Sequence, residues 1–139
     1  MKVFIDTNIW LRYVLGKDSA QYKQSQELIE KIESGRLKPY TSAIVLLEVY
    51  FVLTNLYKIK RPLVQQFIES LLKTRNLTLI EKTSFTKAWN LHQKTQIKLA
   101  DCLIASQLPP KTQLCTFDKD FKRLTEVKSF TPLEILKKL

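Results

Sequence analysis

The amino-acid sequence predicts an α/β fold, in which a mostly parallel central β-sheet is flanked by α-helices. Short runs rich in β-branched and aromatic residues alternate along the chain with longer segments of helical periodicity. This alternation is typical of parallel strands connected by crossover helices. With 139 residues and no repeat, linker or low-complexity segment, we expect a single domain over residues 1–139 with one hydrophobic core.

The first elements are predicted from their end signals. "KVFID" has the composition of a buried strand and ends in Asp6. "DSAQYKQSQELIEKIESG" follows as a helix, with Asp18 as its N-cap and Gly35 as its left-handed stop. "KPYT" is then predicted to be a short strand.

The middle of the chain is predicted to be mainly helical. Ser42 is a good cap for a helix over residues 43–57, and Pro62 is expected at the first position of the next helix, "PLVQQFIESLLKT". These two helices can pack as an antiparallel pair.

The second half continues the alternation. It contains predicted strands at "LTLI", "QLCTF" and "VKSF", helices at "SFTKAWNLHQKT" and "LADCLIASQL", and a helical turn at "KDFKRL". Thr131 and Glu134 form a capping box with Pro132 between them, which predicts a short basic helix at the end.

The composition excludes several functions. No apolar run reaches the roughly 20 residues that span a bilayer, and the sequence begins without a secretory signal, so we expect a cytoplasmic protein. Gly16 and Gly35 are the only glycines, too few for a Walker loop or a dinucleotide-binding fingerprint. With 23 basic and 13 acidic side chains, the net charge of +10 favours a polyanionic partner, either nucleic acid or an acidic protein.

The cysteines and the histidine offer no metal site of their own. Cys102 and Cys115 lie in apolar sequence without metal-ligand spacing, and we expect buried, reduced thiols. His92 is the only histidine, so a zinc site or a histidine-based triad would lack partners, and we expect His92 on a helix surface.

Five acids stand apart from the others. Asp6 ends "VFI", Glu48 lies within "AIVLLEVYFVL", Asp101 lies within "LADCLIA", and Asp118 and Asp120 follow "LCTF". A carboxylate removed from water needs a partner, which for any single one could be a lysine. Here, however, four separate segments each contain an acid in or directly after an apolar run. This pattern predicts a carboxylate cluster at the carboxyl edge of a parallel sheet.

A cluster of this kind calls for a cation. Acids that are close together repel one another, and a divalent ion removes the conflict. Because the predicted ligands are all oxygen atoms, Mg²⁺ or Mn²⁺ is favoured over zinc or copper.

The segments "FIDTNIWLRYVL", "TSAIVLLEVYFVL", "ADCLIAS" and "TFDKDFKRL", in this order and at these spacings, resemble the PIN-domain ribonucleases, especially the VapC toxin group. They extend over nearly the whole chain, and although each motif alone is weak, four together are specific. The resemblance implies a PIN-like fold. It also implies Mg²⁺- or Mn²⁺-dependent hydrolysis of single-stranded or looped RNA that leaves 5′-phosphate and 3′-hydroxyl ends.

The resemblance assigns the acids. Asp6, Glu48, Asp101 and Asp118 match the acidic positions of the family and are the expected catalytic residues. Asp6, Asp101 and Asp118 are the expected metal ligands, and Glu48 is either a further ligand or the group that orients the attacking water. Asp120 is either an additional ligand or the cap of the helical turn "KDFKRL".

The polar residues beside the acids are expected to support them. Thr7, Asn8 and Thr116 match small polar positions of the family and would orient carboxylates or metal-bound waters. The chain departs from the family pattern at two loops. "TQIK" replaces a segment that commonly contains glycine before the third acid, and "LPPKTQ" before the next strand also lacks glycine.

The partners follow from the same reasoning. The candidates for binding RNA phosphates flank the acidic motifs: Arg12, Lys98, Lys119 and Lys122. Resemblance to VapC toxins implies a small VapB-like antitoxin and a homodimer. The aromatic residues of the helix pair at 43–72 fit either a dimer face or the core: Tyr50, Phe51, Tyr57 and Phe67.

Other functions stay in competition with the nuclease. A basic PIN-like module could bind RNA or protein without cutting. A phosphoryl-transfer domain of the haloacid-dehalogenase type also ends its first strand with Asp, but it needs a second acid where this chain has Asn8. A receiver domain needs an acidic pair near the first strand, which is missing.

Overall fold

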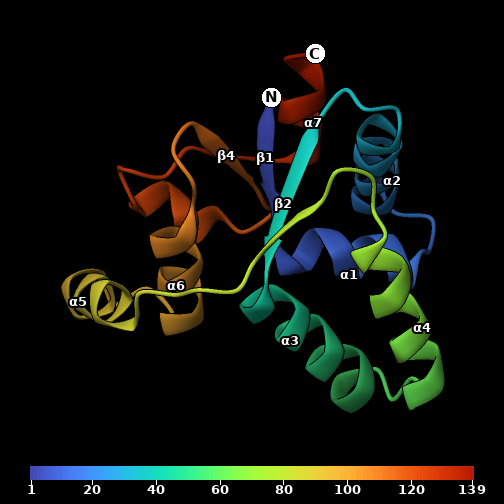
Figure 1. The fold of residues 1–139 in the computed structure, drawn as a ribbon, viewed down its shortest axis with the longest axis horizontal. Helices are drawn as coiled ribbons and strands as arrows, with labels where there is room; N and C mark the ends of the chain where they lie inside the picture. Colours follow the sequence, from blue (N-terminus) through green and yellow to red (C-terminus); the bar gives the residue numbers. More distant parts are fainter.

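The computed structural model describes residues 1–139 and contains a five-stranded sheet in which every pair of neighbouring strands is parallel (Figure 1). The α/β prediction is therefore confirmed. The strand order is β3-β2-β1-β4-β5, with the bounds β1 (Lys2–Ile5), β2 (Lys38–Ser42), β3 (Thr78–Ile80), β4 (Thr112–Cys115) and β5 (Ser129–Phe130). The central strand β1 lies within the hydrophobic core, since Val3, Phe4 and Ile5 are fully buried.

Helices connect the strands and cover the sheet. In Figure 1, α1, α2 and α4 lie on one side of β1 and β2, and α5 and α6 lie on the other. The helices are α1 (Thr7–Leu15), α2 (Ala20–Glu33), α3 (Ala43–Phe51), α4 (Arg61–Leu72), α5 (Phe85–Thr95), α6 (Leu99–Gln107) and α7 (Pro132–Lys137). A π-helical turn, η1 (Val52–Leu56), continues α3, and a 3₁₀ turn, η2 (Lys119–Arg123), follows β4. None of these helices has both the length and the apolar character needed to cross a membrane.

Several predicted end signals are present. The Ser42 hydroxyl accepts a hydrogen bond from the amide of Val45 and caps α3. Thr131 and Glu134 form the predicted capping box at the start of α7. Gly35 follows α2 with a φ of +83°, the left-handed conformation that glycine adopts without a steric penalty.

Other boundaries differ from the prediction. The cap of α2 is Ser19, not Asp18, because the Ser19 hydroxyl accepts from the Tyr22 amide while Asp18 is exposed. The predicted helix over 43–57 changes to a π-helical turn after Phe51. Pro62 occupies the second rather than the first position of α4, which begins at Arg61.

The remaining single-residue predictions can be placed. Cys102 and Cys115 are free and buried, as expected. His92 is partly buried on α5, and its Nδ1 lies 2.6 Å from the carbonyl oxygen of Ile97. This contact links the end of α5 to the segment that leads into α6.

The parallel sheet determines where polar groups gather. Because all strands run in the same direction, their carboxyl ends lie at one edge, where ligands of open α/β sheets bind. Ile5 lies opposite Cys115, and the amide of Asp6 donates to the Cys115 carbonyl at 3.1 Å. Asp6 and Thr116 therefore leave the sheet side by side.

Candidate active site

Asp6 is held at the edge of the sheet by three donors. It follows β1 and caps α1, a helix that was not predicted from the sequence. Its Oδ1 accepts from the Thr7 amide at 2.8 Å, and its Oδ2 accepts from the Thr116 hydroxyl at 2.7 Å and the Asn8 side-chain amide at 3.4 Å. Asp6 is only 4% exposed, so these donors replace most of its hydration.

The Thr116 hydroxyl uses all of its hydrogen-bonding capacity. It donates to Asp6 and accepts from the Asn8 side-chain amide at 3.1 Å and from the Asp118 backbone amide at 3.0 Å. The Asn8 side-chain oxygen accepts from the Phe117 amide at 3.1 Å. One network thus connects the end of β1 to the loop after β4, and within it the side chains of Asn8 and Thr116 donate to Asp6. The Thr7 hydroxyl, by contrast, is buried without a hydrogen-bond partner, and only the Thr7 backbone amide contacts Asp6.

The loop after β4 presents Asp118 and Asp120 differently. Asp118 is partly buried, and its Oδ1 accepts from the Asp120 amide at 2.9 Å, so Asp118 is the N-cap of η2. The alternative in which Asp120 caps this turn is wrong, because Asp120 is the second residue within it. The Asp120 side chain is exposed and makes no hydrogen bond to the protein.

Two helices contribute the other acids. Asp101 lies in the first turn of α6, is 8% exposed and receives no hydrogen bond from the protein. Glu48 lies on α3, which packs against α6. Its Oε2 is 3.8 Å from Nζ of Lys98, the residue that precedes α6. The Glu48 side chain is 31% exposed, so water and Lys98 both offset its charge.

The four carboxylates influence one another electrostatically. The pKa of Asp6 is raised from 3.8 to about 6, mainly by burial and less by the charges of Glu48 and Asp118, against the lowering effect of its hydrogen bonds. Burial likewise raises the pKa of Asp101 from 3.8 to about 7, with contributions from Asp6, Asp118 and Glu48 that Lys98 partly offsets. The charges of Asp6, Glu48 and Asp118 thus all reach Asp101 in the folded chain.

The donor set fits a hard divalent cation. No three acidic, histidine or cysteine side chains are close enough to ligate a single ion together. Mg²⁺ commonly binds proteins through one or two carboxylates and keeps several waters, which can bridge to more distant acids. Asp6, Asp101 and Asp118 supply only oxygen atoms, and a positive charge among them would relieve the repulsion that raises the two pKa values.

The predicted RNA-binding cations occupy different environments. Arg12, on α1, and Lys119, at the start of η2, are exposed. Lys98 pairs with Glu48, as described above. The Lys122 ammonium donates to the Ser129 carbonyl and lies 5.0 Å from the centre of the Phe130 ring, so the chain itself engages this charge.

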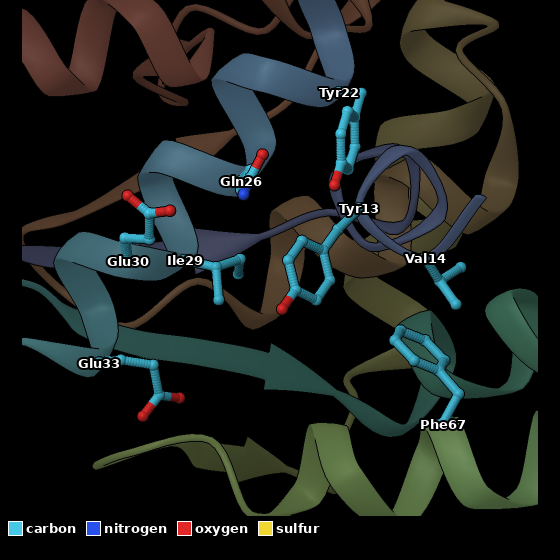
Figure 2. Close-up of a pocket in the computed structure, with 8 residues that line it drawn as sticks. All are labelled: Tyr13, Val14, Tyr22, Gln26, Ile29, Glu30, Glu33 and Phe67. Atoms are coloured by element: carbon cyan, nitrogen blue, oxygen red, sulfur yellow. The ribbon is translucent and has the colours of Figure 1, made fainter. Parts of the chain in front are cut away.

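A pocket at the far end of α1 was not predicted. Its volume is about 410 Å³, and its lining comes from α1, α2 and α4 (Figure 2). Tyr13, Tyr22 and Phe67 give it an aromatic character, and Glu30 and Glu33 add negative charge. No local sequence signal could reveal it, because its residues come from three separate helices.

Comparisons with known proteins agree with this architecture. The PIN domain family matches residues 3–127. Among solved structures, VapBC2 from Rickettsia felis bound to a promoter DNA fragment has a TM-score of 0.69 at 23% identity, covering 94% of this chain and 98% of that one. VapBC-1 from nontypeable Haemophilus influenzae has a TM-score of 0.66 at 19% identity, covering 96% and 99%.

A third similar structure comes from a toxin with a described activity. VapC20 of Mycobacterium tuberculosis, a sarcin-ricin loop cleaving toxin, has a TM-score of 0.69 at 18% identity, covering 88% of this chain and 95% of that one. No curated protein shows significant sequence similarity to the chain.

Proposed function

The chain belongs to the PIN-domain family, and from this premise we propose that it is a divalent-metal-dependent ribonuclease, the toxin of a toxin–antitoxin pair. The observation that carries the proposal is the relation among four acids. One hydrogen-bond network joins Asp6 to the loop of Asp118, and the charges of Asp6, Asp118 and Glu48 all act on Asp101. A structural role explains this poorly, because two of the acids are buried at an energetic cost that nothing in the protein fully compensates.

The acids have distinct roles in the proposed reaction. A bound Mg²⁺ or Mn²⁺ would supply an activated water and stabilise charge on the departing 3′ oxygen. Asp6, Asp101 and Asp118 would hold the ion, either directly or through its bound waters, and Glu48 would either join them or orient the attacking water. Thr116 is a positioning residue that fixes Asp6 in its rotamer.

RNA is the proposed substrate because the chain is strongly basic and because its fold is similar to that of an RNA-cleaving toxin. The net charge of +10 favours a polyanion, and the exposed side chains of Arg12 and Lys119 extend from the elements that carry Asp6 and Asp118. The similar VapC20 is a sarcin-ricin loop cleaving toxin, which makes looped RNA a suitable first substrate to test.

A cleavage assay tests the proposal. Wild type should cut RNA in Mg²⁺ or Mn²⁺, and EDTA should stop the reaction. Asp101→Asn should lose activity, while Asp18→Asn, at an exposed position far from the acids in the sequence, should keep it. Equal cleavage in all of these reactions would reject metal-dependent hydrolysis at this site. RNA binding that persists in EDTA, without cleavage in any metal, would favour the non-catalytic module instead.

An antitoxin is the proposed protein partner. Two of the similar structures are VapBC assemblies, and the pocket of Figure 2 offers aromatic rings beside two glutamates, which fits an apolar segment that carries a basic residue. If a VapB-like protein docks there, its co-expression should relieve toxicity, and Phe67→Glu should abolish that relief without changing cleavage.

A homodimer is the proposed assembly. Several large apolar side chains of the α3–α4 pair are exposed, among them Leu47 at 68%, Phe51 at 56% and Leu63 at 55%. Tyr50 and Phe67, by contrast, are partly buried against the core. A second copy of the chain would cover the exposed residues.

A further inference from the structure

We propose that a basic groove on the β4–β5 side of the protein binds the phosphate backbone of RNA, an inference that rests on the proposed ribonuclease function and names a second contact surface for its substrate. The groove has a volume of about 890 Å³ and lies between α5, the end of α6, the turn that leads into β4, and the loop between η2 and β5. Five cationic side chains line it: Lys87, Lys94, Lys111, Arg123 and Lys128. Glu126 is its only acid.

The cations of the groove are exposed and lack acidic partners. The one ion pair of the protein joins Lys98 to Glu48, outside the groove. Arg123 donates to the Thr95 carbonyl at 2.8 Å, which holds its guanidinium against the wall that α5 provides. A concave surface with charges of one sign concentrates the electrostatic potential and attracts a ligand of the opposite sign. The groove is therefore suited to an anion.

The rest of the lining favours a nucleic acid over an acidic protein. Only a minority of the residues are hydrophobic, and the others include amide and hydroxyl groups such as those of Asn90, Ser106 and Thr125. Protein interfaces usually contain an apolar core, whereas nucleic-acid interfaces are more polar and strongly positive. The hydroxyl and amide groups can donate hydrogen bonds to phosphate oxygens between the cations.

Two segments of the chain connect the groove to the carboxylates. α5 ends at Thr95 in the groove wall, and three residues later α6 begins and carries Asp101. η2 begins directly after Asp118 and ends at Arg123, also in the groove wall. Lys111 and Lys128 precede β4 and β5, toward the edge of the sheet opposite to the acids, so RNA that reaches both places must run along this side of the protein, where successive phosphates meet successive cations.

Charge reversal on two walls of the groove tests the inference. In the Asp101→Asn background, which leaves RNA uncut, Lys87→Glu/Lys128→Glu changes α5 and the loop before β5. The control Lys23→Glu/Lys73→Glu has the same net charge and alters exposed lysines outside the groove. Binding of a fluorescent RNA of about 30 nucleotides is measured by anisotropy at several salt concentrations, with circular dichroism as the check on folding.

The groove variant should bind at least about tenfold more weakly at 100 mM salt, because each lost phosphate contact removes a salt-dependent part of the affinity. The slope of log K against log salt should become shallower by about 1.4 for two lost contacts to single-stranded RNA. The control should change affinity less than about twofold. The neutral variant Lys87→Gln/Lys128→Gln should also lower the slope, and it replaces the charge-reversed variant if that one does not fold.

Two results would overturn the inference. One is equal weakening by the groove and control variants, which would mean that overall charge alone governs binding. The other is unchanged RNA binding together with loss of binding to a polyglutamate peptide, which would identify a protein site. If wild type cuts no RNA in any metal but the groove variant still loses RNA affinity, the nuclease proposal fails while the groove remains an RNA site.

Discussion

Replacing Asp101 with asparagine should stabilise the metal-free protein while abolishing its activity. The native Asp101 keeps its proton up to a pKa of about 7, whereas the unfolded chain releases it near 3.8. Wild-type stability therefore falls as the pH rises from about 4 to 7 and levels off above that range. At pH 8 the buried charge costs about 4 kcal/mol, since each tenfold change in the protonation equilibrium is worth about 1.4 kcal/mol. At pH 4 the cost is below about 1 kcal/mol.

Urea unfolding in EDTA at fixed protein concentration measures this effect. Asp101→Asn should raise the free energy of unfolding by about 3 to 4 kcal/mol at pH 8 and by less than about 1 kcal/mol at pH 4. In thermal unfolding at pH 8, the gain corresponds to roughly 10 °C. Saturating Mg²⁺ should narrow the difference, because the ion binds and stabilises only the wild type. The exposed Asp18→Asn should change stability by less than about 0.5 kcal/mol at either pH.

Two outcomes would refute this reasoning. If Asp101→Asn is no more stable than wild type at pH 8, the carboxylate is not held at an electrostatic cost. If the gain is the same at pH 4 and pH 8, it comes from packing or helix propensity rather than from removal of a charge. The combination of higher stability with lost cleavage distinguishes a functional acid from a structural one.

Further predictions concern the other parts of the site and surface. Thr116→Val removes the hydroxyl donor to Asp6 and should weaken Mn²⁺ binding by about 10- to 100-fold in calorimetry, whereas Thr116→Ser should retain it. Because Asp6 and Asp101 must lose protons with pKa values of about 6 and 7, apparent Mn²⁺ affinity should increase from pH 5.5 to 8, and a flat profile would contradict this. Phe51→Glu should convert a dimer to a monomer in sedimentation, and a monomeric wild type at micromolar concentration would remove the basis for this expectation. Gln96→Gly should stabilise the fold by up to about 1 kcal/mol in urea unfolding, since Gln96 has a φ of +60°, and Gln96→Ala should bring no such gain.

The sequence predicts the sheet well because its strands are short apolar runs bounded by strong signals. Ser42 and the Thr131–Glu134 box are local features whose hydrogen bonds involve residues three positions apart, so they can be recognised without tertiary information. The N-cap of α2 is harder to predict, because Asp18 and Ser19 are adjacent and both residue types are good caps. Only the extended backbone of Ser19, directly before the helix, decides between them.

There is a recognisable reason why the sequence did not predict helix α1. Its residues belong to the motif "FIDTNIWLRYVL", in which the strand that ends at Asp6 is the stronger local signal. Ile9, Trp10, Tyr13 and Val14 follow the spacing of one helix face, and Asp6 is a good N-cap. The same aspartate thus ends a strand, begins a helix and faces the other acids.

The loops where glycine is absent retain the backbone geometry that glycine would favour. Gln96 in "TQIK" and Lys111 in "LPPKTQ" have φ values of +60° and +59°. Both positions therefore adopt the left-handed conformation at a steric cost, which tertiary contacts such as the bond between His92 and the Ile97 carbonyl help to offset.

The two halves of the carboxylate site are stabilised by different means, and this difference bears on how they could respond to an ion. Asp6 and Asp118 belong to a hydrogen-bond network through Thr116, which fixes them before any ligand arrives. Asp101 receives no such bond, and Glu48 has only the distant ammonium of Lys98. A cation that binds the fixed half would draw Asp101 toward it and would compete with Lys98 for Glu48. Lys98, which is largely exposed, would then be free to contact RNA phosphates.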